Sequence, residues 1–454
     1  MLWVFMETKG GGKFYFPEFK KEFESQFIID QKISEESMIF VELRVNEEFS
    51  KFLMEKHNEK ETRLRCSING ELESGMNIQV EEAYFIGANI KNFMATLKFK
   101  IFSNVIIGKR GFKDSKDDEE IHFLITNLEF VGTERTVSQK GGWRLDRSRI
   151  TVGNYELIFK QFDDYDKLIK ALKKEFKDTG AFTTEIIIKT SLKNHEEVKG
   201  IVENVCYLLS FARGVDIIPS KSFHLREGEK VWGEATNIGK RPFRAGDYLI
   251  HHLPPEGLFD FIEEVYPNYI KYKDNIGLPV LFNLYTAMKS AFYMELRCLI
   301  GYVILETLGE NLQGFYQERE DPIESSLKLK PKKLKKILPK EHNLSKDNIN
   351  DICSKLSYNN PSLQDSIERI KRDFKFLYRT EDKKLFEYRK YFVHKGRFPE
   401  GINKVQTYQE IISLIDRLLL SILKYTGDYC DVSRGYKTEK IEYEKLIKLK
   451  KNSK

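Results

Sequence analysis

The sequence has few cysteines and no hydrophobic run long enough to cross a membrane. Its 454 residues include five cysteines, all far apart and without a Cys-x-x-Cys pair, which excludes zinc sites built on such pairs. A scattered, odd-numbered set is typical of reduced thiols in a cytoplasmic protein. The best apolar segments, 299–305 and 411–423, are shorter than the roughly 20 residues of a membrane span. We therefore expect a soluble, cytoplasmic protein that has no membrane partner.

An excess of charge of one sign is also missing. The chain has 75 basic and 69 acidic residues, a formal net charge of +6. This balance excludes a histone-like polycation and a disordered acidic tail. Any nucleic-acid surface must therefore be a local patch. The length permits several domains, each with a core of its own.

Residues 1–190 have the two-residue alternation of β-strands. The expected strands are rich in β-branched and aromatic residues and cover residues 38–44, 76–85, 93–107, 121–131 and 155–162. A helix is expected at 165–176. The triplet Gly10-Gly11-Gly12 precedes Lys13 and Phe14, without the Ser or Thr of a phosphate loop, and favours a hairpin turn. These features predict an antiparallel, sandwich-like or barrel-like sheet.

Residues 191–277 have a mixed α/β pattern, and we expect them to pack on the β-rich region. The pattern predicts a helix at 195–213 that ends at Gly214, after a strand at 184–189. Two further strands are expected at 215–219 and 230–235, and a short helix at 258–266 that Pro267 stops.

Residues 278–430 have helical periodicity throughout. A nearly continuous apolar stretch at 282–308 predicts two helices of a bundle. A further helix is expected to be capped by Thr380 and ended by Gly396, and another covers 407–425. Residues 431–454 form a lysine-rich tail. The fold class is therefore α+β and multidomain, with an all-α C-terminal bundle.

Most motifs of catalysis or metal binding are missing. The chain has no HExxH, GxSxG or GxGxxG sequence. The adjacent His251 and His252 would point to opposite faces of a strand, so we expect neither a metal site nor a cofactor. One candidate pair remains, in which four residues separate Arg389 from His394. Such a pair also occurs without function, when arginine pairs with a surface carboxylate and histidine caps a helix end.

The context of this pair resembles a known family. The run Arg389-Lys390-Tyr391-Phe392-Val393-His394-Lys395-Gly396, on a helix late in a bundle, is similar to the R-x4-6-H motif of HEPN domains. The segment VILETL at 303–308 and a long closing helix are similar too. The segment 202–217, which lies between a β-rich region and the bundle, resembles ApeA-type anti-phage HEPN proteins more loosely. Lys390 departs from the Asn, His or Asp that often follows the arginine.

The resemblance implies a metal-independent endoribonuclease that acts as a dimer. Histidine can transfer protons at the ribose 2′-hydroxyl, and arginine can stabilise charge on the phosphate. We expect Arg389 and His394 to be catalytic, and Lys390, Tyr391, Lys395 and Arg397 to contact RNA. The lysine-rich segment 328–340 is a further basic patch.

The N-terminal region is far larger than needed to position two side chains, which suggests a sensing or regulatory role. The expected protein is a prokaryotic defence effector whose N-terminal region responds to a phage-derived or other trigger. Two alternatives remain open. The bundle could be a non-catalytic adaptor that binds nucleotides or proteins, or the chain could be the toxin of a toxin–antitoxin pair.

Overall fold

The chain forms two compact units, residues 1–263 and 264–454, in the computed structural model. The described residues are 8–317 and 379–440, with gaps at 18–19, 33–37, 47–49, 53, 56–63, 92–93, 102–104, 110–118, 138–141, 175–179, 236–242, 244–247 and 252–253, and with isolated positions between 367 and 376. The division falls inside helix α4 (Pro255–Ile276), ahead of the expected boundary at 277. Phe259 packs on Phe130 and Phe159 in the first unit, whereas Tyr269 stacks on Phe282 in the second.

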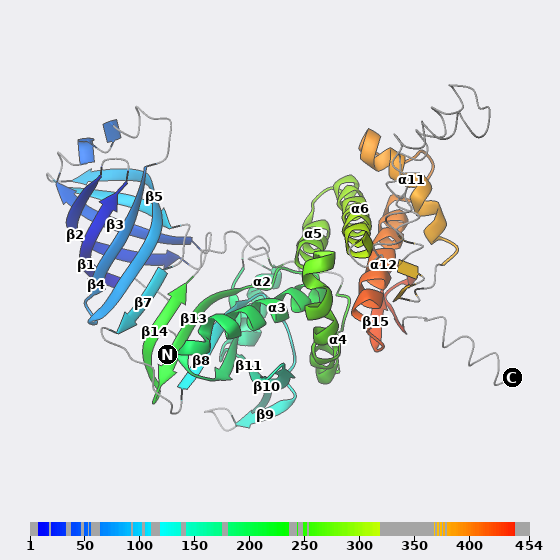
Figure 1. The fold of residues 1–454 in the computed structure, drawn as a ribbon, viewed down its shortest axis with the longest axis horizontal. Helices are drawn as coiled ribbons and strands as arrows, with labels where there is room; N and C mark the ends of the chain where they lie inside the picture. The colour runs from blue at the N-terminus through cyan, green and yellow to red at the C-terminus, as the bar shows by residue number, and fades with distance from the viewer. Residues whose placement is uncertain are drawn as a thin grey trace, which may run out of the picture. The chain divides into compact units, whose positions relative to one another are not determined.

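The first unit begins with a closed antiparallel ring of strands (Figure 1). Its strands are β1 (Thr8–Phe16), β2 (Lys21–Lys32), β3 (Met38–Asn46), β4 (Arg65–Leu72), β5 (Met76–Lys91) and β6 (Met94–Ile101). Pairing of β4 with both β1 and β5 closes the ring. Alternate residues of every strand point inward and are buried. The expected antiparallel β region is therefore confirmed in a barrel-like form.

The glycine triplet lies inside strand β1, so the turn expected there is wrong. Gly12 is paired with Gly70 of β4, and a Cβ added to Gly12 would lie 2.5 Å from the Gly70 Cα. Gly10 is paired with Phe27 of β2, whose ring occupies the position of a Gly10 side chain. The triplet therefore allows close backbone approach and leaves room for an aromatic ring.

The same sheet continues out of the ring through β7 (Val105–Lys109) and β14 (Glu229–Ala235). Beyond them follow β13 (Pro219–Arg226), β8 (Glu119–Thr126), β12 (Phe182–Lys189), β11 (Tyr155–Gln161), β10 (Trp143–Val152) and β9 (Glu134–Val137). Strands β13 and β14 belong to the segment expected at 191–277, but they pair with β8 and β7. Residues 1–190 and 191–235 therefore share one sheet.

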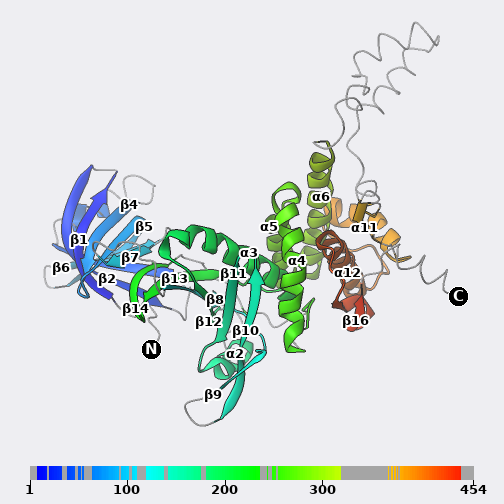
Figure 2. The ribbon, with the colours of Figure 1, turned by 60° about the horizontal axis from the view of Figure 1, so that its bottom comes forward.

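Helix α3 (His195–Arg213) lies against one face of this sheet (Figure 2) and contacts β13, and α2 (Tyr165–Lys174) contacts β12. The expected helix at 195–213 is confirmed to the residue. Gly214 ends it in the left-handed region at φ 67°, where its N–H donates to the Ser210 carbonyl at 2.8 Å. Phe123 of β8 stacks on His195 at 6.0 Å, which identifies the face that α3 covers.

The second unit contains the rest of α4, then α5 (Leu278–Ser290), α6 (Met294–Gln317), α11 (Asp382–Lys395) and α12 (Lys404–Leu423). The two helices expected at 282–308 are confirmed as α5 and α6. The stop expected at Pro267 is wrong, because α4 runs through it. Buried Val265, Tyr269 and Tyr272 continue one apolar face past the proline. This burial offsets the backbone hydrogen bond that Pro267 cannot make.

The tail expected at 431–454 is ordered in its first part. Strands β15 (Asp428–Asp431) and β16 (Lys437–Lys440) form a small antiparallel sheet, joined by the short helix η2 (Val432–Arg434) that packs on α12. Residues 441–454 lie outside the described residues.

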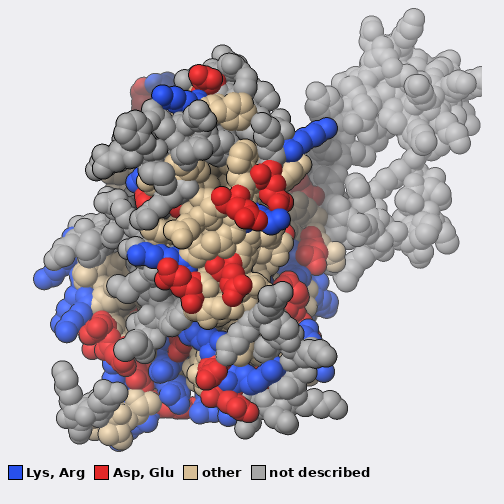
Figure 3. Space-filling view, turned by 90° about the vertical axis from the view of Figure 1, so that its left-hand side faces the viewer, with Lys and Arg blue, Asp and Glu red and all other residues tan. Residues whose placement is uncertain are grey.

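The described chain is mixed α/β, with strands in its N-terminal part and helices in its C-terminal part. None of its described helices combines the length and the apolar character required to span a bilayer. The face in Figure 3 carries acidic and basic side chains side by side around uncharged areas. That face therefore has no large patch of a single charge sign among the described residues.

Candidate functional site

Helix α11 carries the Arg389–His394 pair, and buried contacts fix its position in the second unit. At its start, the carboxylate of Asp382 is bound by Arg417 of α12 at 2.6 and 3.0 Å and accepts the Arg379 backbone N–H at 2.7 Å. The hydroxyl of Tyr302 on α6 donates to the Leu385 carbonyl at 2.6 Å. Asp382 is thus a buried anchor, and Glu381, not Thr380, occupies the N-cap position.

The second half of α11 is held against α6 by aromatic packing. Phe392 is buried, stacks on Tyr302 at 5.4 Å, and meets Phe398 edge-on at 4.8 Å. Gly396 ends the helix in the left-handed region at φ 59° and donates its N–H to the Phe392 carbonyl. The expected helix end at Gly396 is confirmed, and it fixes the backbone next to His394.

Arg389 is half-buried and forms an ion pair with Glu306 of α6. Glu306 belongs to the VILETL segment at 303–308, so that segment contacts the arginine directly. Both side chains keep about a third of their surface exposed, 38% for Arg389 and 31% for Glu306. An approaching phosphate can therefore reach the guanidinium, in competition with the Glu306 carboxylate.

His394 lies in the last turn of α11 and is exposed. Within the described residues its imidazole makes no hydrogen bond or ion pair, and none joins it to Arg389. Positions i and i+5 differ by about 140° around a helix, so one helix directs the two side chains to different sides. The imidazole is therefore free to exchange protons with a bound molecule.

The residues expected to contact RNA lie around this pair. The ammonium groups of Lys390 and Lys395 lie 5.3 and 5.0 Å from the centre of the Tyr391 ring, and Arg397 is exposed just beyond the helix end. Lys390, Tyr391 and Lys395 thus form a cationic aromatic patch beside His394, and each lysine gains a cation–π contact.

Two other features noted in the sequence are described only in part or not at all. The lysine-rich segment 328–340 lies outside the described residues. His251 is exposed and packs edge-on against Tyr248 at 4.6 Å, while His252 is outside the described residues.

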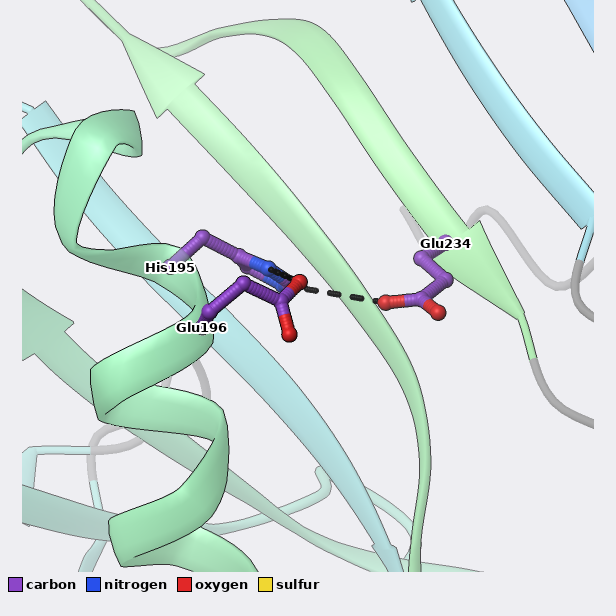
Figure 4. Close-up of side chains that lie close together, drawn as sticks. All are labelled: His195, Glu196 and Glu234. Atoms are coloured by element: carbon purple, nitrogen blue, oxygen red, sulfur yellow. Dashed lines mark hydrogen bonds and ion pairs between the residues drawn. The ribbon is translucent and has the colours of Figure 1, made fainter.

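A second polar cluster, which the sequence did not suggest, lies in the first unit. His195 and Glu196 start α3, and Glu234 reaches them from β14 (Figure 4). Their ligand atoms lie within 4.8 Å of one another. The His195 Nδ1 is 3.2 Å from Glu196, and its Nε2 is 3.0 Å from the Ser222 hydroxyl. Burial lowers the pKa of His195, which favours a neutral imidazole.

The charges around this cluster fit an ion-pair network better than a metal centre. The Lys199 ammonium contacts both Glu234 oxygens, at 2.9 and 3.0 Å, so a divalent cation would have to displace it. The two carboxylates also approach different nitrogens of His195, whereas one metal ion takes a single imidazole nitrogen. Residues 195 and 234 are far apart in the sequence. The packing of α3 on β13 and the pairing of β13 with β14 bring them together.

The comparisons with known proteins concern this part of the chain. Residues 113–246 match the family model of the YopA central domain. The range contains β8 to β14 with α2 and α3, and therefore the His195 cluster. No curated protein and no solved structure matches the chain. The HEPN resemblance concerns residues outside the matched range, whereas the ApeA-like segment 202–217 lies within it, and both stay predictions.

Proposed function

We propose that the chain is a metal-independent endoribonuclease of the HEPN type, a prokaryotic defence effector that its N-terminal region regulates. The observation that carries this proposal is the arrangement on α11. A half-exposed arginine and an exposed histidine, which has no partner in the described part of the chain, lie five residues apart, beside a cationic aromatic patch. Cleavage of a phosphodiester in RNA requires these groups: a fixed cation that stabilises the phosphate charge, and a group that donates and accepts protons.

The chemistry assigned to each group follows from its side-chain type. His394 removes the proton of a ribose 2′-hydroxyl, or protonates the leaving 5′-oxygen, because an imidazole can both accept and donate a proton. Arg389 stays charged and donates to the phosphate oxygens as negative charge develops. Attack by the 2′-hydroxyl forms a 2′,3′-cyclic phosphate and releases a 5′-hydroxyl end. DNA lacks this nucleophile and should resist cleavage.

A dimer would bring complementary groups together. The α6 surface that leads to Glu306 is apolar and exposed: Phe292 and Tyr293 precede the helix, and Leu296 and Val303 follow at a seven-residue interval. Monomers rarely leave such a stripe open. We expect a second copy to pack on this stripe about a two-fold axis, with Arg389 of one subunit near His394 of the partner.

The test is cleavage of a labelled RNA by purified full-length protein in EDTA, with and without lysate from phage-infected cells as a source of trigger. Arg389→Ala and His394→Ala should each abolish cleavage, while circular dichroism shows an unchanged fold. Lys383→Ala, at an exposed position on the same helix, is the matched control. Cleavage by both site variants at the parental rate would rule out the assignment.

One observation favours a non-catalytic, protein-binding adaptor instead. The ion pair with Glu306 gives Arg389 a structural partner, and an arginine of such an adaptor would need no other. Glu306→Gln distinguishes the two functions. If Arg389 binds phosphate, loss of the competing carboxylate should tighten binding of a 2′-O-methyl oligoribonucleotide several-fold. If the pair is only structural, this affinity should stay unchanged.

A further inference from the structure

The face of the first-unit sheet that lies opposite α3 presents a row of like charges. Arg147 of β10 and Lys160 of β11 are directly opposite each other, so both side chains lie on the same face. Like charges in this position destabilise a sheet. Glu185 of β12, which follows in the same row, is 4.0 Å from Lys160 but only 2.8 Å from His122. The row therefore keeps a local excess of positive charge.

Within the described residues, the guanidinium of Arg147 lacks the partners of a structural arginine. Its Nε is buried and has no hydrogen-bond partner among the described residues. Within the same part of the chain its guanidinium forms no ion pair, in contrast to neighbouring Arg149, which binds Glu134 at 2.6 Å and Glu156 at 2.7 Å. Because the Nε is enclosed by protein atoms, an anionic ligand would approach the terminal nitrogens of the guanidinium and give this charge a partner.

A hollow of about 420 Å³ adjoins Arg147, within the size range of small-molecule sites. Half-buried Ile158 and Ile187 form its apolar floor, on neighbouring strands. Lys189 adds a second cation without an ion pair among the described residues. The hollow thus combines positive charge with an apolar surface, which fits an anion attached to a ring system.

The far end of the hollow offers acceptors. Glu156 and Glu120 line it together with Asn154. Glu156 is four residues along β11 from Lys160, the partner of Arg147, a distance of about 13 Å at the rise of a strand. The Arg147 and Glu156 side chains shorten this gap between the backbones, so that Glu156 can accept hydrogen bonds from ribose hydroxyls while the phosphate contacts Arg147, as acidic residues do in dinucleotide sites.

We propose that this hollow binds a ribonucleoside monophosphate, with its phosphate at Arg147, its base on Ile158 and Ile187, and its ribose hydroxyls at Glu156 or Glu120. The ligand neutralises the Arg147–Lys160 row and gives the Arg147 guanidinium an anionic partner. The site lies wholly within residues 120–189. It requires no part of the C-terminal helices and holds whether or not they cleave RNA.

Calorimetric titration of the full-length protein with each of the four ribonucleoside 5′-monophosphates tests this site. At least one should bind with a Kd below about 1 mM, and Arg147→Gln should weaken it about tenfold or more, as expected for a charge-assisted contact. Arg135→Gln is the matched control, because Arg135 lies on β9 over the Trp143 ring, 4.6 Å from its centre, and does not line the hollow. Thermal unfolding of both variants checks the fold.

Three outcomes would overturn the assignment. The first is that none of the four nucleotides binds at millimolar concentration. The second is that Arg147→Gln and Arg135→Gln have the same effect. The third is that inorganic phosphate, or an oligoribonucleotide alone, binds through Arg147 as tightly as any monophosphate, since the apolar floor and the acidic end would then have no role.

Discussion

At the scale of single residues, Asp416 is a carboxyl group in the apolar interior of the second unit. It lies on α12, is almost fully buried, and accepts a hydrogen bond from the Tyr285 hydroxyl at 2.6 Å. Burial raises the pKa of Asp416 to about 7, and Lys289 and Tyr285 offset only part of this effect. The residue is therefore protonated in the folded chain under conditions where it ionises in the unfolded chain.

This difference predicts a stability that falls as pH rises from about 4, the ordinary pKa of an aspartate, to about 7. In that window the folded state holds the extra proton, so the free energy of unfolding decreases by up to about 1.4 kcal/mol per pH unit. Above pH 7 the Asp416 carboxyl is ionised in both the folded and the unfolded state, so it no longer changes the free energy of unfolding with pH. Asp416→Asn keeps an acceptor for Tyr285 and should remove this part of the pH dependence.

Urea unfolding at several pH values measures this effect. Asp428→Asn is the control, since Asp428 is exposed on β15, and its curve should parallel that of the parent protein. A parent and an Asp416→Asn variant with equal slopes between pH 4 and 7 would contradict the prediction.

At the scale of elements, two pairs of glycines show where close packing requires the absence of a side chain. In β1, a Cβ at Gly12 would lie 2.4 Å from the Asn69 carbonyl oxygen, whereas a Cβ at Gly11 would meet nothing closer than 4.0 Å. Gly12→Ala should therefore destabilise the first unit by about 1–3 kcal/mol. Gly11→Ala should be neutral or slightly stabilising, by up to about 1 kcal/mol. Equal effects in thermal unfolding would show that the triplet is not within a strand.

The helices offer a similar comparison. A Cβ at Gly301 of α6 would lie 2.6 Å from Ile411 of α12 and 3.3 Å from Met288 of α5, whereas Gly200 of α3 has open space around it. Gly301→Ala should cost about 1–3 kcal/mol through overpacking. Gly200→Ala should stabilise by about 0.5–1 kcal/mol, since alanine is the better helix former. Chemical denaturation compares the two, and a stabilising Gly301→Ala would contradict the packing of α6 against α12.

At the scale of the whole molecule, the proposed ribonuclease activity requires assembly of two chains. Val303→Glu places a charge in the apolar stripe of α6, and we expect it to convert a dimer into a monomer and abolish RNA cleavage. Val405→Glu makes the same change at an exposed valine of α12 and should leave the dimer intact. Sedimentation velocity distinguishes these cases, and a parent protein that is monomeric at micromolar concentration would contradict the dimer.

Mixing the two inactive site variants tests whether the subunits share one cleft. An Arg389→Ala subunit keeps His394, and a His394→Ala subunit keeps Arg389. If each cleft takes one group from each chain, a mixture that exchanges subunits should regain part of the parental cleavage rate. A mixture that stays inactive after exchange would place both groups of a cleft on one chain.

The sequence by itself determined the elements with strong local signals. Helix α3 was predicted to the residue because its apolar periodicity ends at a glycine, and α5, α6 and the end of α11 were predicted for similar reasons. Local signals also predicted the one pair of residues, Arg389 and His394, on which the proposed activity depends. Periodicity and helix ends are properties of neighbouring residues, so they can be read without the fold.

Only the tertiary structure decided what depends on residues far apart in the chain. The glycine triplet lies within a strand because the Phe27 ring and the Gly70 backbone pack closely against it. Helix α4 continues past Pro267 because its apolar face is buried both before and after the proline. The partner of Arg389 is 83 residues away, and strand pairing alone sets Arg147 opposite Lys160. Such contacts depend on register and packing, which no local pattern of amino acids specifies.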